Sequence, residues 1–295
     1  MKRGAFTKLT GLSVIAISTT GFIRFNGKSY EGDCETTSDI LGPFYRPDSP
    51  VRDNLVLLGM PGDIVELTGV IRHKDCQTPH KNAKVELWHC SSEEIYDNDS
   101  DEFRYRGTTY CDDNGMYKFK TQMPVPYDAG GGLIRPAHFH MMVSAPGYQS
   151  FVTQIYFQGD PYVEKDPWSA ASKAQYRKLK VEEENGTKKV VFDCNINDKL
   201  KASISALNQI VGKYKNDTSE KVMEFFERNG QLWSKNEVFG ERYAYVGENK
   251  FEYSGMPTGL YEKLQFDFKQ VGTIKLQLTA VWENGKEIKE LFTKL

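Results

Sequence analysis

The chain has 295 residues, and its 38 lysines and arginines against 40 aspartates and glutamates give a formal net charge of −2. A balanced charge of this kind provides no general attraction for nucleic acid or for an anionic membrane surface. With 16 tyrosines and 17 phenylalanines, the composition favours β-structure, and the length suits one large domain or two ordinary ones.

Residues 1–22 differ from the rest of the chain. Basic residues precede a modest apolar run, Leu9–Ile17, and Ala16–Ser18 has the small-x-small pattern of a cleavage site. The run is too short and too polar to span a bilayer. We therefore predict a signal-like segment and export to the periplasm or the extracellular space, with a cytoplasmic protein as the alternative.

The cysteine pattern fits either compartment. There is no CxxC pair, which argues against a structural zinc site. In an exported chain, one or two disulfides could form among Cys34, Cys76, Cys90 and Cys111. The odd total of five leaves at least one free thiol, counting Cys194.

Short apolar–polar alternations begin at about Asp63 and are separated by turn residues. In chain order they predict strands at 63–72, at 84–90, on both sides of Asp113–Gly115, and at 137–146, 150–160 and 187–196. This spacing predicts an all-β antiparallel sandwich over residues 34–198. Ser169–Lys180 is the best candidate for a short helix in this half.

The polar stretch Lys199–Tyr214 could be partly helical, and strand patterns resume after it. Residues 221–235 predict a hairpin turning at Asn229–Gly230, and residues 263–292 predict strands turning at Gly272 and at Asn284–Gly285. We predict a second, small all-β domain over 208–295. It contains no histidine or cysteine, so it is expected to be a packing or binding module.

His138 and His140, two of only five histidines, lie two residues apart in a predicted strand. Their side chains should project from the same face, with Phe139 directed into the core. Two imidazoles on one face can chelate a metal ion. A third histidine would suggest zinc or copper, and a carboxylate would suggest ferrous iron.

Neither is evident beside this pair, but tyrosines are plentiful nearby, at 96, 105, 110, 117 and 127. A phenol has an unperturbed pKa of about 10, so a hard, highly charged cation such as Fe(III) is needed to deprotonate it near neutral pH. Two phenolates and one hydroxide would neutralise a ferric ion, and two neutral imidazoles would complete five-coordination.

Six stretches of the chain occur together in a familiar order: GPFYRPDSP (42–50), KVELWHC (84–90), EEIYDND (93–99), DDNGMYKFKTQMPVPY (112–127), RPAHFH (135–140) and TQIYFQGDPY (153–162). Over about residues 34–195 the chain resembles the intradiol ring-cleavage dioxygenases, the family that includes catechol and protocatechuate dioxygenases. The WHC motif and Cys34 are most similar to the exported branch.

The resemblance implies a ferric ion bound by Tyr96, Tyr127, His138 and His140. Related sequences usually have Gly-x-Tyr before the first tyrosine ligand, whereas Glu94 and Ile95 precede Tyr96 here. Tyr105 is therefore an alternative for this ligand.

The resemblance also implies the catalytic residues. Tyr127 would leave the metal and act as a base, Arg135 would stabilise negative charge, and Gln154 would orient the substrate or an intermediate. The reaction would cleave a catechol-type ring between its hydroxylated carbons with O2, giving a muconate-type diacid. A carboxylated ring could pair with Arg46, Arg104 or Arg106, so catechol, hydroxyquinol and protocatechuate remain open as substrates.

Two other interpretations compete with this one. The strand pattern is also similar to that of transthyretin-like sandwiches, which are non-catalytic binding or structural modules, and a degenerate dioxygenase could bind an aromatic ring without cleaving it. The C-terminal half is loosely similar to the small β-barrel appended to some serine β-lactamase-like proteins. A homo-oligomer is also possible, because aromatic-rich sandwich faces often pair.

Overall fold

The computed structural model describes residues 17–18, 21–25, 30–32, 36–146, 148–196, 201–270, 273–282 and 285–295. The first three of these ranges form a small antiparallel sheet of β1 (Ile17–Ser18), β2 (Gly21–Phe25) and β3 (Tyr30–Gly32). Residues 1–16 lie outside the described residues, so the signal-like segment and export remain predictions. None of the described helices is long and apolar enough to cross a membrane.

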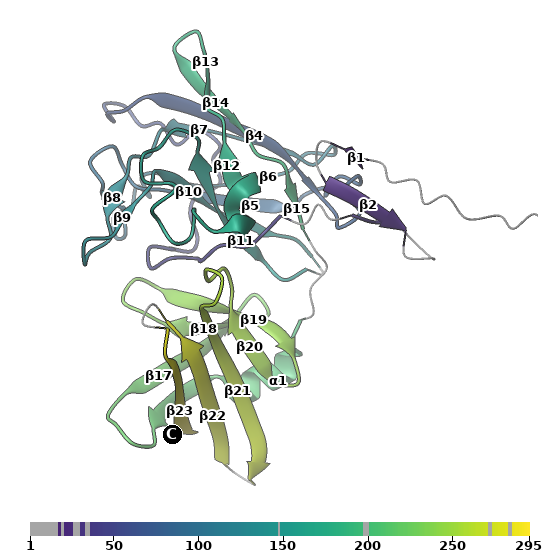
Figure 1. Ribbon diagram of the computed structural model, residues 1–295, viewed down its shortest axis with the longest axis vertical. Helices are drawn as coiled ribbons and strands as arrows, with labels where there is room; N and C mark the ends of the chain where they lie inside the picture. Colours follow the sequence, from purple (N-terminus) through teal and green to yellow (C-terminus); the bar gives the residue numbers. More distant parts are fainter. Residues whose placement is uncertain are drawn as a thin grey trace, which may run out of the picture.

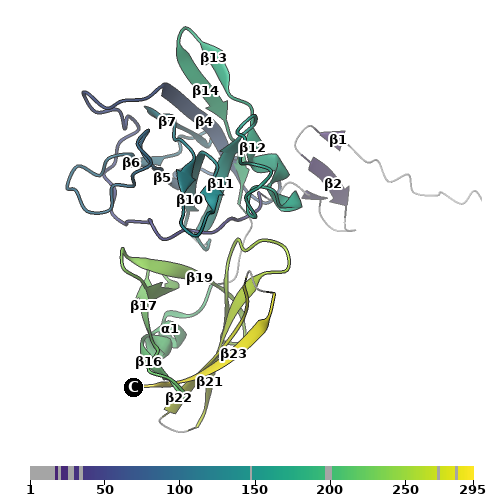
Figure 2. The same ribbon diagram turned by 60° about the vertical axis from the view of Figure 1, so that its left-hand side comes forward.

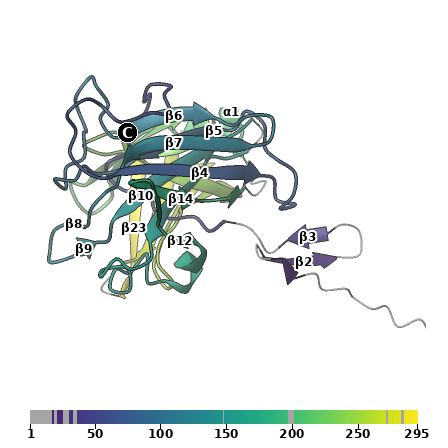
Figure 3. The ribbon, with the colours of Figure 1, turned by 90° about the horizontal axis from the view of Figure 1, so that it is seen from above.

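Two five-stranded sheets form a sandwich in the first half of the chain (Figure 1). The first has the order β12-β11-β10-β5-β6, with bounds Lys178–Leu179, Phe151–Phe157, His138–Ser144, Lys84–Trp88 and Arg106–Tyr110. The second joins β13 (Glu182–Glu184), β14 (Thr187–Val191), β4 (Ile64–Arg72), β15 (Cys194–Asn195) and β7 (Met116–Gln122). Figure 3 shows β4 and β7 side by side.

The core of the sandwich follows from strand alternation. Along β4 the side chains alternate between buried and half-buried, and along β7, which pairs with it, they alternate between exposed and buried up to Thr121. Phe139 of β10 is fully buried in this core with Leu67 and Phe119, as the sequence predicted. The neighbours of Phe139, His138 and His140, therefore lie on the other face of the sheet.

The all-β prediction is confirmed, but the sandwich is not purely antiparallel. Strands β14 and β15 pair with β4 in parallel, and β12 pairs with β11 in parallel. The strands on either side of Asp113–Gly115, β6 and β7, belong to different sheets. Alternation shows which side chains are buried, but it does not determine which strand is the neighbour.

The predicted helix at Ser169–Lys180 is a short 3-10 helix, η1 (Ser172–Arg177), without a side-chain cap at its start. The polar stretch after the sandwich contains α1 (Ile204–Ile210), which the Ser203 hydroxyl caps by accepting from the Ala206 amide. Both helices are therefore shorter than the segments that predicted them.

The second half is a closed eight-stranded barrel in the order β16 to β23. Its strands are Gly212–Asn216, Val222–Arg228, Gln231–Lys235, Gly240–Gly247, Lys250–Tyr253, Tyr261–Gln270, Thr273–Val281 and Glu287–Lys294. The predicted hairpin is confirmed: β17 and β18 join at Asn229–Gly230, where both residues have positive φ. The strands of the sandwich run from Ile64 to Asn195, and those of the barrel from Gly212 to Lys294. The domain bounds 34–198 and 208–295 stay predictions.

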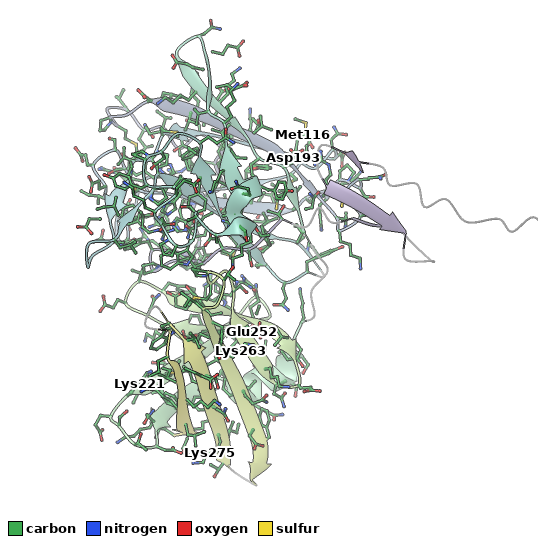
Figure 4. The ribbon with its side chains drawn as sticks, viewed as in Figure 1. Met116, Asp193, Lys221, Glu252, Lys263 and Lys275 are labelled. Carbon is green, nitrogen blue, oxygen red and sulfur yellow. The ribbon has the colours of Figure 1, made fainter. Side chains whose placement is uncertain are left out.

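The barrel has an interior of its own, and opposite charges pair on its outside. Figure 4 labels Glu252 and Lys263, whose carboxylate and ammonium lie 3.3 Å apart. Figures 1 and 2 show the barrel below the sandwich, with the blue-purple chain that leads to β4 running between them.

The cysteines differ in state. Cys76 is in a disulfide, whereas Cys90, Cys111 and Cys194 are free and buried. The expectation of one disulfide is therefore confirmed at Cys76, and Cys34 lies outside the described residues. Cys90 and Cys111 take no part in a disulfide, because both thiols are enclosed by packed side chains.

Candidate metal centre

The two histidines of β10 point at one another from adjacent same-face positions. Their Nε2 atoms are 3.1 Å apart, and both side chains are about 1% exposed. The strand register places them opposite Tyr156 and Gln154 of β11. The ring of Trp88, on the other neighbouring strand, stacks on His140 with centroids 5.0 Å apart.

Hydrogen bonding determines which nitrogen of His138 is available. Its Nδ1 lies 2.6 Å from the Pro136 carbonyl oxygen, which can only accept, so Nδ1 carries the proton and Nε2 presents a lone pair. The pKa of each histidine is well below its usual value because of burial, with Arg135 adding to the effect at His138. Both imidazoles are therefore neutral, which is the form that binds metal ions.

Two tyrosines complete the cluster. Tyr96 comes from the connection between β5 and β6, and its hydroxyl is 3.0 Å from His140 Nε2. Tyr127 starts β8 (Tyr127–Asp128), and its ring is 5.5 Å from that of Tyr96. Tyr105, the alternative ligand, packs against His89 instead. The structure thus brings together Tyr96, Tyr127, His138 and His140.

Burial raises the pKa of both phenols, and the neighbouring Tyr127 raises that of Tyr96 further. Within the described residues, no group of three or more histidines, cysteines and acids could hold a metal ion. A metal at the histidine pair would therefore need these tyrosines, and a cation able to deprotonate them.

The spacing of the donors fits such an ion. Two ligands at right angles on an ion with bonds of about 2.1 Å are separated by about 3 Å. The two contacts of His140 Nε2, to His138 and to Tyr96, measure 3.1 and 3.0 Å. His140 Nε2 thus has a donor on either side at the spacing of adjacent ligands, and the chemistry of these donors suits Fe(III).

The loop that carries Tyr96 is held without the glycine that the family resemblance implies two residues before it. Glu94 takes the glycine position with φ of +66°. Arg106 fixes the following residues: its Nε donates to the Asp97 carbonyl at 2.6 Å and its Nη2 to Asn98 Oδ1 at 2.9 Å. Its Nη1 donates to the Phe44 carbonyl at 2.8 Å.

The three arginines suggested as partners for a carboxylated substrate are engaged elsewhere. Arg106 is buried in the loop contacts just described, and Arg104 pairs with Glu102 at the surface. Arg46 donates to the Ser100 carbonyl and lies over the Phe103 ring. These contacts occupy all three guanidinium groups, so none of the three arginines is placed to bind a substrate carboxylate.

Arg135 and Gln154 lie beside the cluster. Arg135 is directly opposite Tyr127 in the pairing of β8 with β9 (Ile134–Arg135). Its Nη2 donates to Gln154 Oε1 at 2.7 Å, its Nε lies 2.7 Å from Asp166 Oδ1, and its guanidinium packs on Trp168. Arg135 is thus a buried cation with a fixed orientation next to Tyr127.

The sequence analysis missed the residues behind Arg135. Tyr156 donates to Gln154 Oε1 and to Asp39 Oδ2, and Arg177 forms a buried ion pair with the same Asp39 carboxylate. Asp39 and Arg177 are far apart in the sequence, so no local pattern marks them. A buried arginine requires an acidic partner, but for Arg135 that partner is Asp166, so this requirement does not point to Asp39 or Arg177.

The segment Asp39–Tyr45, which we call the wall segment, closes the cluster on one side. Gly42 has a positive φ, and a Cβ there would lie 3.0 Å from His140 Cε1. Phe44 stacks on Tyr96 with centroids 4.3 Å apart. The GPFYRP motif, one of the six stretches that carry the family resemblance, thus lies directly against two of the donors.

Comparison with protein families agrees with this geometry. Residues 40–198, which are more than half of the chain, match the model of the Dioxygenase family. The chain belongs to this family. The match ends before the barrel begins at Gly212. Membership favours an enzyme over the transthyretin-like module.

The chain is also similar in sequence to individual dioxygenases. The chain is 40% identical over 154 residues to catechol 1,2-dioxygenase of Candida albicans, covering 44% of this chain and 50% of that protein. It is 34% identical over 158 residues to chlorocatechol 1,2-dioxygenase of Rhodococcus opacus, covering 46% and 61%. The chain thus spans less than two thirds of the length of these relatives.

Among solved structures, catechol 1,2-dioxygenase from Acinetobacter sp. ADP1 resembles this chain with a TM-score of 0.50 and 27% sequence identity. The similarity covers 56% of this chain and 63% of that one.

Proposed function

We propose that this protein is an intradiol ring-cleavage dioxygenase that uses Fe(III) and O2 to open a catechol-type ring between its two hydroxylated carbons. The observation that carries the proposal is the pair of contacts of His140 Nε2, 3.1 Å to His138 Nε2 and 3.0 Å to the Tyr96 hydroxyl, with Tyr127 beside them. The family membership of residues 40–198 supports the same chemistry.

Tyr96, Tyr127, His138 and His140 would hold the metal. When bound, a ferric ion would draw electron density from a catecholate and make the ring reactive toward O2. The Tyr127 phenolate would take up a substrate hydroxyl proton at its Oη, because burial raises the pKa of this phenol and so makes its phenolate a strong base. Arg135, which faces Tyr127, lowers that pKa in part.

Arg135 would stabilise the negative charge that develops on the substrate. It remains protonated at any working pH, since its pKa is raised by Tyr156 and Asp166 despite burial. The amide of Gln154 is engaged at both ends, accepting from Arg135 and donating to the Ile40 carbonyl at 3.0 Å. Gln154 would therefore act mainly by orienting Arg135.

A substrate without a carboxyl group agrees best with these contacts, because Arg46, Arg104 and Arg106 already have partners. The names of the relatives, catechol and chlorocatechol dioxygenases, point to the same class of ring. We expect catechol to be cleaved with a higher kcat/KM than protocatechuate.

The test combines metal analysis, a visible spectrum and product analysis on the purified full chain. We expect about one iron per chain, a tyrosinate band that shifts when catechol is added without oxygen, and a muconate-type diacid formed with one O2 consumed. Tyr127→Phe should lose most of the band and of the turnover. Tyr105→Phe is the matched control, because both rings are nearly buried, at 6% and 7% exposed, and it should leave the band unchanged.

Protein that binds no iron, even after reconstitution with ferric salt, would refute the proposal. An unchanged tyrosinate band in Tyr127→Phe would remove Tyr127 from the ligand set. Loss of the band in Tyr105→Phe would make Tyr105 a ligand in place of Tyr96.

A further inference from the structure

The wall segment lies between the candidate metal centre and the barrel. On its inner side, the Ile40 carbonyl accepts from Gln154, Gly42 faces His140 and Phe44 covers Tyr96. The Asp39 carboxylate accepts from Tyr156 on the same side. In Figures 1 and 2 this part of the chain passes between the sandwich and the barrel.

On its outer side, the wall segment contacts the barrel at both ends. Trp233 of β18 stacks on Tyr45 with centroids 5.6 Å apart and an interplanar angle of 20°. Tyr45 in turn packs edge-on against Trp88, the residue that stacks on His140. An unbroken series of rings thus connects the barrel to a candidate ligand.

At the other end, Gly255 lies against the backbone of the wall segment. This glycine follows β20, has φ of +92°, and a Cβ on it would fall 1.9 Å from the Asp39 carbonyl carbon. Its neighbour Met256 accepts a hydrogen bond from Lys173 of the sandwich through its carbonyl. Only a residue without a side chain permits this approach.

These contacts are separate from the barrel's own interior. The barrel closes through the pairing of β16 with β23 and has an apolar cluster of its own. Trp233 belongs instead to a cluster that contains Tyr45, Trp88, Tyr96 and Tyr127. One set of packed side chains therefore includes both candidate tyrosine ligands and a barrel residue.

We propose that the barrel is a positioning module for the metal centre, and that Trp233 and Gly255 are positioning residues that hold the wall segment against it. The consequence for turnover rests on the proposed dioxygenase function. The structural part of the proposal, that the barrel fixes the wall segment, is independent of the proposed function.

The test compares two glycines near each other in the barrel. Gly255→Ala and Gly259→Ala both introduce a side chain at a positive φ, +92° and +88°. A Cβ at Gly259 meets nothing within 4 Å, whereas one at Gly255 must displace Asp39 or the barrel. Backbone strain is thus the same in both variants, and only Gly255→Ala pushes on the wall segment.

Hydrogen exchange of the full-length chain reports on the wall segment directly, since the Asp39 amide donates to the Val152 carbonyl at 3.0 Å. We expect exchange of the amides in 39–45 to be about tenfold faster in Gly255→Ala and unchanged in Gly259→Ala. The kcat/KM for catechol should fall by about tenfold in the first variant alone, because small displacements at a reacting centre are costly.

If Gly255→Ala does not fold, Trp233→Leu replaces it, with Phe251→Leu as its control. Phe251 is buried in the barrel interior, packs on Phe266, and belongs to the barrel's own cluster. Equal effects of Trp233→Leu and Phe251→Leu on exchange of residues 39–45 would overturn the proposal, as would equal effects of the two glycine variants. Faster exchange with unaltered kcat/KM would also overturn the positioning role.

Wild-type protein without ring-cleaving activity would refute the proposed function. The exchange comparison would still decide whether the barrel holds the wall segment.

Discussion

Glu94 has a backbone conformation that a glycine would adopt without strain, so Glu94→Gly should stabilise the protein. Its φ of +66° costs a residue with a side chain about 1–2 kcal/mol. Glycine loses about 0.5–1 kcal/mol more backbone entropy on folding, which offsets part of this gain. The side chain is exposed, so little else changes, and the net expectation is a stabilisation of about 0.5–1 kcal/mol.

Glu93 provides the matched control. It is also exposed and in the same loop, but it is not among the residues with positive φ. Glu93→Gly should therefore cost about 0.5–1 kcal/mol, the opposite sign. Urea unfolding of both variants beside the wild type measures the two free energies. If Glu94→Gly is destabilising by as much as Glu93→Gly, the strain assigned to this loop does not exist.

Three further predictions concern stability. Asp39→Asn should cost about 3–5 kcal/mol in urea unfolding, because it leaves the buried Arg177 without its countercharge, and a loss below 1 kcal/mol would contradict this. Tyr117→Phe should cost about 1–3 kcal/mol by the same assay, since the buried Phe192 carbonyl loses the hydroxyl that donates to it at 2.7 Å, and no loss would mean that water replaces it. His89 should make stability depend on pH: burial lowers its pKa to about 4, so the unfolded chain, with a pKa of about 6.5, binds the proton first and stability falls as pH drops below that value. Between about pH 7.5 and pH 5 the wild type should lose about 2 kcal/mol more than His89→Gln, and parallel losses would show that His89 is not buried as the neutral form.

The parts of the fold that depend on local pattern could be predicted from the sequence. Alternation identified β4, the two-residue spacing put His138 and His140 on one face, and Asn229–Gly230 marked a hairpin. Each of these features is determined by residues within a few positions of one another.

What could not be predicted depends on partners that are distant in the sequence. The parallel pairing of β14 with β4, and the ion pair of Asp39 with Arg177, are both of this kind. Arg106 shows why the role of a residue near a candidate site is hard to predict from sequence. A cation close to an active-site motif suggests a partner for the substrate. Only its three backbone and side-chain acceptors reveal that it holds a loop.

The placement of the wall segment has a consequence for how the protein is made. Asp39 and Tyr45 leave the ribosome before Trp233 and Gly255, which cover their outer side. Contacts between distant parts of a chain form slowly, after local ones. The sandwich strands can pair while synthesis continues, but the wall segment acquires its outer contacts only after the barrel has emerged and folded. Completion of the candidate metal centre would thus wait for the folding of the barrel.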